Sequence, residues 1–497
     1  MRRLAGVVLL LMCGACGLRS AHAQAARRRV NATTAVIAPA GPLTERLRRL
    51  LDEPPFDRAL WGIAITDPSG RLVFERNGDR LFVPASNAKL VVSAVATALL
   101  SPDFRFRTSV YTSGALQDSV LSGDLVLYGR GDPSLDDRFG PDRLSALAQL
   151  ADSLHAIGVR RVAGDLIGDA SYFDSTTIHP SWESYDLSWW YAAPVSALGF
   201  NDNSVDFRIA PTIPGAPPAI SFEPDLGLVQ FSNAARTVAV DSPRTMDFRR
   251  LPGTNFIRAE GDVPADARPW TENVSISDGA TWAAAAFRVA LENAGIAVAG
   301  RTRTTYNPNA TAAARATAPL AERQSPPLHD LIEPILRVSH NWYAEMLLKT
   351  LGRELTGVGS WDSGLAVERR FLRDSLRVDT TQFAVADGSG LSHWNLVTPR
   401  AFVQLLMAMH DRPGFTTFRE ALPVAGSTGT LRSRYRMNGL RGQVRAKTGS
   451  ISNVNTLSGY LETAEGTWTF SIQLNNHTAR NRDALKRIDD IVAAIAR

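Results

Sequence analysis

A chain of 497 residues with 44% hydrophobic and 21% charged residues is long enough for roughly two to four globular domains, which excludes a disordered chain. The formal charge of +5 falls to +2 if Arg2, Arg3 and Arg19 leave with an N-terminal signal, so the positive charge does not indicate a nucleic-acid partner. The eight histidines lack close ligand spacing, and we expect neither a metal nor another cofactor.

The N-terminus has the features of a secretory signal. Arg2 and Arg3 precede the apolar run 4–12, and the small-residue triplet 21–23 resembles a cleavage site. We therefore expect a signal peptide over residues 1–23, export to the periplasm and no transmembrane segment in the mature chain. Cys16 leaves a lipid anchor open as an alternative. Both cysteines lie in this signal, so a thiol nucleophile is excluded from the mature chain.

The first predicted elements after the signal lead towards a serine. Helical spacing over 43–51 is followed by a predicted hairpin over 61–82, with its turn at 67–70. The apolar run 90–100 predicts a buried helix, which places Ser86 at or near its first turn.

The middle of the chain, residues 105–324, has a different sequence pattern from the segments before and after it. Short strand patterns, a few helical patterns and frequent Gly and Pro residues predict one or two β-rich domains. The segment 307–327 is rich in Ala, Thr and Pro and is interpreted as a linker back into the first domain.

The last third returns to longer elements. We expect a helix over 328–351, a Gly-rich loop at 387–390 and a helix over 399–410. Two alternating strands and a terminal amphipathic helix, whose apolar residues include Ile488 and Ile491, follow. Strands and helices from both ends of the chain would then share one α+β layer.

Ser86 and Lys89 form the first chemical motif. A spacing of three at a helix start brings both side chains to one face, within hydrogen-bond reach. A neutral lysine can take the proton of a serine hydroxyl, so the pair predicts a nucleophile with its base. Only four residues of this Arg-rich chain are Lys, and arginine cannot replace a lysine that must lose its proton.

Two further motifs follow in the order that β-lactamases and penicillin-binding proteins use, Ser339-His340-Asn341 and Lys447-Thr448-Gly449 with Ser450. The long gap after the first motif and the stretches 387–392, 422–426 and 446–450 resemble the class C low-molecular-mass penicillin-binding proteins, the D-Ala-D-Ala carboxypeptidase/endopeptidase family. The resemblance implies an α+β fold, in which a serine β-lactamase/transpeptidase-like domain, an antiparallel sheet flanked by helices, is split by an insertion of one or two β-rich domains. It assigns residues 24–104 and 325–497 to the first domain and 105–324 to the insertion.

The resemblance also implies roles for the motif residues. Ser86 would be the nucleophile and Lys89 its base, Ser339 would relay a proton to the leaving D-Ala, and Asn341 would hold the substrate amide. Lys447 would support Ser339. The terminal carboxylate would bind at Thr448, Gly449 and Ser450, and the N–H groups of Ser86 and Ser450 would form the oxyanion hole. The substrates would be peptidoglycan stem peptides, with β-lactams as covalent inhibitors.

Three further positions lie outside this set. Asp169 and Phe173 resemble residues that approach the diamino-acid side chain of the stem peptide, but a capping Asp and a core Phe explain them equally well. His340 stands where the family usually has Asp, and could add a pH dependence near neutrality.

Two other functions stay open. A β-lactam hydrolase or esterase on the same scaffold would differ only in how fast water deacylates Ser86. A catalytically silent peptidoglycan-binding protein would have no need of a lysine beside a serine, which argues against it. The balance of carboxypeptidase and endopeptidase activity is not readable from these motifs.

Overall fold

A computed structural model describes residues 43–435 and 439–497. The predicted signal peptide and Cys16 therefore lie outside the described residues. Within those two ranges no helix has both the length and the apolar character that crossing a bilayer requires. The same ranges contain no cluster of three or more His, Cys, Asp or Glu side chains suited to hold a metal ion.

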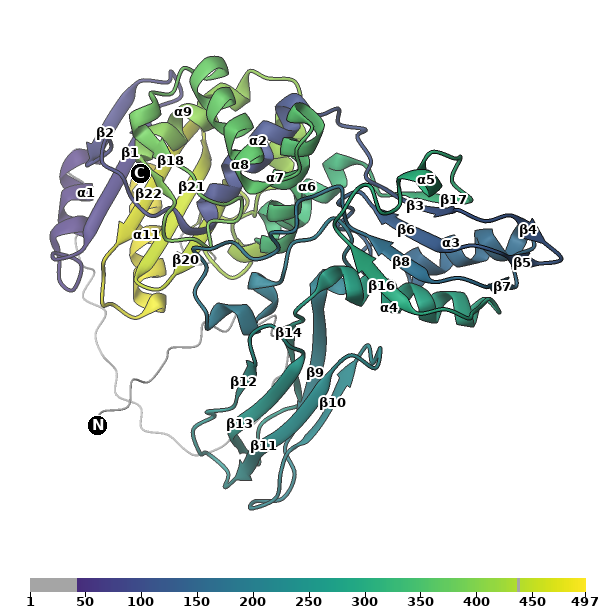
Figure 1. Cartoon of the computed structure of the whole chain (residues 1–497). Helices are drawn as coiled ribbons and strands as arrows, with labels where there is room; N and C mark the ends of the chain where they lie inside the picture. The colour runs from purple at the N-terminus through teal and green to yellow at the C-terminus, as the bar shows by residue number, and fades with distance from the viewer. Residues whose placement is uncertain (1–42, 436–438) are drawn as a thin grey trace. The chain divides into compact units, whose positions relative to one another are not determined.

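An antiparallel sheet of five strands, in the order β2-β1-β22-β21-β20, joins the two ends of the described chain (Figure 1). Its strands are β1 (Leu60–Thr66), β2 (Leu72–Arg76), β20 (Val444–Ile451), β21 (Val454–Thr463) and β22 (Gly466–Asn475). The alternation predicted from the sequence is present in β22, where Phe470, Ile472 and Leu474 are fully buried on one face. Pairing of β1 with β22 brings Ile63 opposite Ile472.

Helices cover both faces of this sheet. On one face α1 (Leu43–Asp52) packs with α11 (Asn481–Ile495), whose Ile488 shares an apolar core with Leu461 of β21. Tyr460, the neighbour of Leu461, points to the other face because side chains alternate along a strand. There its hydroxyl donates to the carbonyl of Leu406 in α9 (Pro399–His410).

A larger group of helices packs on the α9 side. It consists of α2 (Lys89–Leu99), α6 (Leu328–Arg337), α7 (Asn341–Thr356), α8 (Trp361–Arg370) and α10 (Phe415–Glu420). Residues 89–97 of α2 are all buried, which explains the unbroken apolar run of this helix.

The predicted helix over 328–351 is wrong, because the chain forms two helices there. α6 ends at Arg337 and α7 begins at Asn341. Ser339 lies between them with a φ of 66°, a left-handed conformation that ends a helix. The break places the second motif, Ser339 to Asn341, at the start of α7.

Residues 105–324, which we call the inserted segment after the expectation from the sequence, form sheets of their own. A mixed sheet has the order β16-β8-β6-β3-β17, a small sheet the order β15-β7-β5-β4, and two three-stranded sheets the orders β10-β9-β14 and β11-β13-β12. The strands of the mixed sheet are β3 (Arg107–Thr112), β6 (Leu125–Gly129), β8 (Leu166–Asp169), β16 (Thr302–Thr305) and β17 (Ala321–Gln324). The other strands are β4 (Leu116–Gln117), β5 (Val120–Leu121), β7 (Arg161–Val162), β9 (Ser204–Ala210), β10 (Ala219–Glu223), β11 (Gln230–Val238), β12 (Asp247–Arg250), β13 (Phe256–Pro264), β14 (Trp270–Ser275) and β15 (Ala297–Val298).

Two helices accompany the mixed sheet. α3 (Ser145–Ala156) packs on α4 (Gly279–Asn293), and α4 contacts β8 and β16. The expectation that 307–327 is only a linker is wrong. This segment holds the short helix α5 (Ala312–Arg315) and β17, which pairs antiparallel with β3. The Ala, Thr and Pro composition of this segment gave no indication of β17, which pairs with β3, a strand about 200 residues earlier in the chain.

Candidate active site

Ser86 and Lys89 lie where a short 3₁₀ helix, Ala85–Ala88, runs into α2. The spacing of three brings Lys89 Nζ to 2.9 Å from Ser86 Oγ, so the contact predicted from the sequence is present. The lysine side chain is fully buried, whereas Ser86 is partly exposed. A serine within reach of solvent and a lysine beneath it form an arrangement that can activate the hydroxyl.

The second and third motifs meet the first at this point. Asn341, the first residue of α7, accepts a hydrogen bond of 2.6 Å from Lys89 Nζ at its Oδ1. Lys447 extends from β20, and its Nζ lies 2.8 Å from Ser339 Oγ. Each serine therefore has its own lysine, and the left-handed conformation of Ser339 places its hydroxyl beside Lys447.

Burial sets the charge of both lysines. Loss of solvent lowers the pKa of Lys89 from 10.5 to about 7, although the carboxylates of Asp387 and Glu345 oppose this change. Burial also lowers the pKa of Lys447 well below its usual value, and the nearby charge of Lys89 adds to the effect. A lysine with a pKa near neutrality can hold or release a proton at little cost, as a general base must.

The loop 387–390, part of a stretch that resembles the family, contacts the amine of Lys89. The carbonyl of Ser389 accepts a hydrogen bond of 2.6 Å from Lys89 Nζ. Glu345 of α7 holds the loop by accepting from the N–H groups of Ser389 at 2.7 Å and Gly388 at 3.1 Å. Asp387 accepts from the N–H of Gly390 at 2.8 Å. Neither Glu345 nor Ser389 was identified as a site residue from the sequence. Ser389 lies in the stretch 387–392 but was given no role there, and no motif marks Glu345.

The third motif presents two hydroxyls along β20. Thr448 Oγ1 donates to Thr430 Oγ1 at 2.8 Å, and Ser450 Oγ accepts from Asn455 Nδ2 at 3.0 Å. Gly449 lies between them against the backbone of the first motif. A Cβ on Gly449 would approach Pro84 O to 2.8 Å and Ser86 N to 3.0 Å, so only glycine lets the strand pass this close.

Asp169 and Phe173 are placed differently from the motif residues. Asp169 ends β8, is fully buried, and its carboxylate accepts from the N–H of Ser171 and the hydroxyl of Thr311. Arg315 Nε lies 3.2 Å from the same carboxylate. Phe173 is 2% exposed, with its ring 5.9 Å from Lys349 Nζ. A substrate amine at Asp169 would have to displace Arg315, so its role, like that of Phe173, stays a prediction.

The fold and the paired Ser–Lys contacts define a serine acyl-transferring enzyme of the penicillin-binding protein class. The model of the D-Ala-D-Ala carboxypeptidase 3 (S13) family matches residues 43–497. The D-alanyl-D-alanine carboxypeptidase of Actinomadura sp. (strain R39) is 35% identical over 448 residues, which cover 88% of this chain and 81% of that protein. The chain belongs to this S13 family of serine D-Ala-D-Ala carboxypeptidases.

Solved structures agree on the fold. Penicillin-binding protein 4 of Haemophilus influenzae matches with a TM-score of 0.79 at 23% identity, over 90% of this chain and 98% of that one. A second structure of that protein, in complex with a β-lactam, matches with a TM-score of 0.74. The predicted fold class, a transpeptidase-like α+β domain with additional sheet domains, is thereby confirmed.

Proposed function

We propose that this enzyme removes the terminal D-Ala of peptidoglycan stem peptides through an acyl-enzyme on Ser86, and that β-lactams acylate the same residue. The single observation that carries the proposal is the position of Lys89 Nζ, 2.9 Å from Ser86 Oγ and 2.6 Å from Asn341 Oδ1. In this proposal the catalytic and binding roles are those that the family resemblance assigned.

Acylation begins with neutral Lys89. The carbonyl oxygens of Asn341 and Ser389 can only accept hydrogen bonds, so they take the two protons of the neutral amine. Its lone pair then faces Ser86 Oγ and accepts the hydroxyl proton while the oxygen attacks the penultimate D-Ala carbonyl. The N–H groups of Ser86 and Ser450 receive the negative charge on the carbonyl oxygen.

The leaving D-Ala needs a proton on its nitrogen. Ser339 supplies it, because Lys447 Nζ lies 2.8 Å from Ser339 Oγ and can replace the proton that the hydroxyl gives away. Thr448 and Ser450 hold the terminal carboxylate. Lys89, with its pKa lowered to about 7, gives the proton that it took from Ser86 to solvent and becomes neutral again, while Lys447 regains its own proton from solvent. Water then attacks the acyl-enzyme and passes a proton to neutral Lys89, which returns it to Ser86 Oγ as the shortened peptide leaves.

Intact-protein mass spectrometry after addition of penicillin tests the proposal. We expect one stable adduct on the wild type and none on Ser86→Ala, together with release of D-Ala from an acyl-D-Ala-D-Ala peptide by the wild type alone. An undiminished adduct on Ser86→Ala would contradict the assignment of the nucleophile. Rapid loss of the wild-type adduct, with opened β-lactam in solution, would favour the β-lactam hydrolase instead.

We further propose export of the mature enzyme to the periplasm, either free or anchored at Cys16. The sequence over residues 1–23 supports the export. We also propose that residues 24–104 and 325–497 form the catalytic domain and that 105–324 is inserted into it. Mass determination of the protein secreted with its own leader distinguishes cleavage after residue 23 from lipidation at Cys16.

A further inference from the structure

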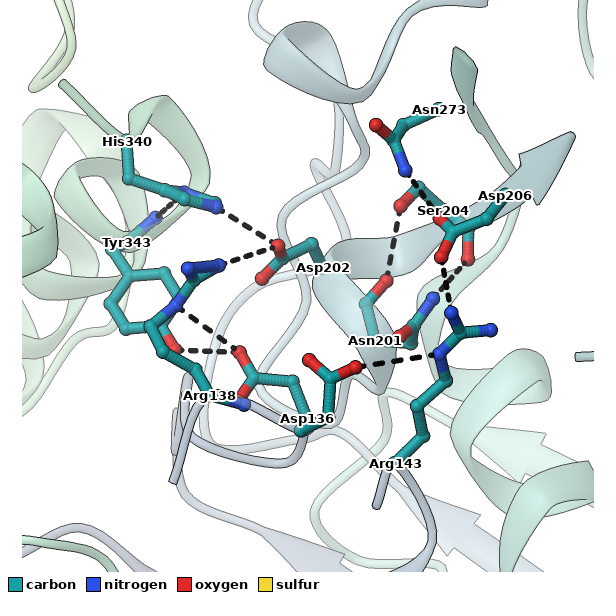
Figure 2. A network of polar contacts seen from close by, with 11 residues as sticks. Asp136, Arg138, Arg143, Asn201, Asp202, Ser204, Asp206, Asn273, His340 and Tyr343 are labelled. Atoms are coloured by element: carbon teal, nitrogen blue, oxygen red, sulfur yellow. Dashed lines mark hydrogen bonds and ion pairs between the residues drawn. The ribbon is translucent and has the colours of Figure 1, made fainter. Parts of the chain in front are cut away.

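His340 lies between the two catalytic residues of the second motif and is almost completely buried, with 2% exposure. It precedes α7, where its Nδ1 accepts from the N–H of Tyr343 at 3.5 Å and so caps the helix. Its Nε2 lies 2.9 Å from Asp202 Oδ2, a contact that Figure 2 shows. A backbone N–H only donates and a carboxylate only accepts, so both contacts require a neutral ring with its proton on Nε2.

Asp202 reaches His340 from the inserted segment. The backbone from Asn201 to Asn203 is left-handed, with φ angles of 51°, 53° and 49°. Three consecutive non-glycine residues rarely adopt this conformation, and here it directs the Asp202 carboxylate towards α7. Arg138, also from the inserted segment, donates to the same carboxylate oxygen at 3.2 Å. His340 and Arg138 thus share one oxygen of the Asp202 carboxylate (Figure 2).

The remaining neighbours fix the ring in place. Tyr343 and Trp190 flank it, with centroid distances of 4.7 and 5.3 Å. The hydroxyl of Tyr343 donates to Asp136 at 2.7 Å, so the inserted segment also binds this side of α7. The carbonyl of Tyr191, beside Trp190, accepts from Asn341 Nδ2 at 2.8 Å.

We propose that Asp202 and His340 form a positioning pair through which the inserted segment holds Ser339 and Asn341 in their catalytic geometry, and that protonation of His340 in acid releases this hold. The inference rests on the proposed function, since it concerns the motif that the proposal makes catalytic. A proton on Nδ1 would remove the acceptor of the Tyr343 N–H and leave the start of α7 without its cap.

The surroundings of His340 determine the pH range in which its ring is protonated. Burial is the main effect and lowers the pKa of His340 from its usual 6.5, and the cations of Arg138 and Lys89 act in the same direction. Asp202 opposes them, while its own pKa is lowered to about 2 by His340 and Arg138 despite its burial. Asp136 and Tyr343 complete the titratable groups around the ring, and burial raises the pKa of both. At neutral pH the ring is therefore neutral, and its Nδ1 accepts from the N–H of Tyr343 while its Nε2 donates to Asp202.

Variants at position 340 distinguish a role of His340 in positioning the second motif from a role in packing alone. Asparagine caps helices well, can donate to Asp202 and cannot be protonated, so His340→Asn should acylate with penicillin within about threefold of the wild-type rate at pH 7.5. In the wild type, protonation of Lys89 and of His340 should each suppress acylation. A plot of the logarithm of the acylation rate against pH should therefore approach a slope of 2 below the pKa of His340. In His340→Asn only Lys89 is protonated in this range, so the same plot should have a slope of 1. His329→Asn, a change at an exposed histidine, is the matched control and should follow the wild type.

A charge exchange tests the partner. His340→Asp places a second carboxylate against Asp202 in a buried site and should lower acylation at least about tenfold. His340→Asp combined with Asp202→Asn removes the repulsion and should recover most of that loss. A double variant as slow as His340→Asp, or a slope in His340→Asn equal to the wild-type slope, would overturn the proposal.

Hydrogen–deuterium exchange gives a readout that does not depend on acylation. Below the pKa of His340, amides at the start of α7 should lose protection in the wild type, measured as the exchange rate relative to the intrinsic rate at the same pH. His340→Asn should suppress this loss of protection. If penicillin fails to acylate the wild type, the proposed function fails, yet the exchange experiment still decides whether the pair controls α7. Identical exchange in both proteins across pH 5 to 8 would refute the pair.

Discussion

Asn341 connects the second motif to the first, because its Oδ1 accepts a hydrogen bond of 2.6 Å from Lys89 Nζ. Its Nδ2 donates to the carbonyl of Tyr191 in the inserted segment, so the amide cannot turn without breaking one of the two contacts. The direction of the Lys89 amine thus depends on residues from three distant parts of the chain. This dependence explains why small changes behind the lysine should alter the chemistry at Ser86.

Lys89→Arg should lower the rate of penicillin acylation at least about a hundredfold, because guanidinium keeps its charge and cannot accept the Ser86 proton. In the wild type only the neutral amine acts, and its pKa is lowered to about 7. Acylation should therefore rise as pH increases through about 7 and then level off. Stopped-flow or mass-spectrometric rates from pH 5.5 to 9 measure this profile. An active arginine variant would exclude Lys89 as the base.

Glu345→Gln should lower the rate of acylation by about tenfold. The Glu345 carboxylate accepts from three N–H groups, those of Gly388, Ser389 and the Trp361 ring, and in the variant at least one of them would face the NH₂ group of the amide instead of an oxygen. The variant also loses a carboxylate that raises the pKa of Lys89, so its pH profile should move to lower pH. Acylation rates across the same pH range measure both effects.

The matched control for that change is Glu368→Gln on α8. Both carboxyl oxygens of Glu368 are buried without a hydrogen-bond partner, and burial raises its pKa well above the usual value. Glutamine resembles the protonated acid in shape, so this variant should acylate like the wild type. Equal losses in the two variants would mean that any change in this buried region impairs the enzyme, and that Glu345 has no special position.

Local patterns predicted the parts of this site that depend on neighbours in sequence. Ser86 and Lys89 are three residues apart, so a helix start alone brings them together. The helix Pro399–His410 was predicted with its observed bounds, because Thr398 and Pro399 are typical of a helix start.

Local sequence patterns could not predict contacts between residues that are far apart in the chain. The break at Ser339 was missed because residues 328–351 have helical spacing. The contact between Ser339 and Lys447 joins residues 108 positions apart, which no local pattern reveals. Asp202 lies 138 residues before His340, and no motif links the two. Glu345 looks like one more polar residue of a helix until the loop 387–390 folds against it.

Thr448→Ala should lower kcat/KM for peptides with a free terminal carboxylate by about tenfold to a hundredfold, the effect of losing one charge-assisted hydrogen bond. The same peptides ending in an amide should be affected much less. The comparison needs kcat/KM for both substrates with both proteins. Thr467→Ala, near the start of β22 and separated from β20 by β21, is the control and should change neither value. An equal loss for acid and amide substrates would argue against a carboxylate contact at Thr448.

Asp169→Ala should act on stability more than on specificity, because the carboxylate is buried against Arg315 and Thr311. Removing it leaves buried donors unpaired, and we expect a loss of about 1 to 3 kcal/mol in the free energy of unfolding. Asp165→Ala, which breaks a more exposed contact with Arg303 that solvent screens, should lower the free energy of unfolding less than Asp169→Ala does. Denaturant unfolding of both variants measures these values.

The same variant decides whether Asp169 recognises the substrate. Acetylation of the side-chain amine of a stem peptide should change kcat/KM by the same factor in the wild type and in Asp169→Ala if Arg315 is the permanent partner of the carboxylate. If acetylation instead weakens turnover by the wild type and has little effect on the variant, the substrate amine displaces Arg315 during binding. Penicillin carries no such amine, so its acylation rate should be nearly equal in the two proteins under either outcome, and a large difference would indicate that the motif residues themselves have moved.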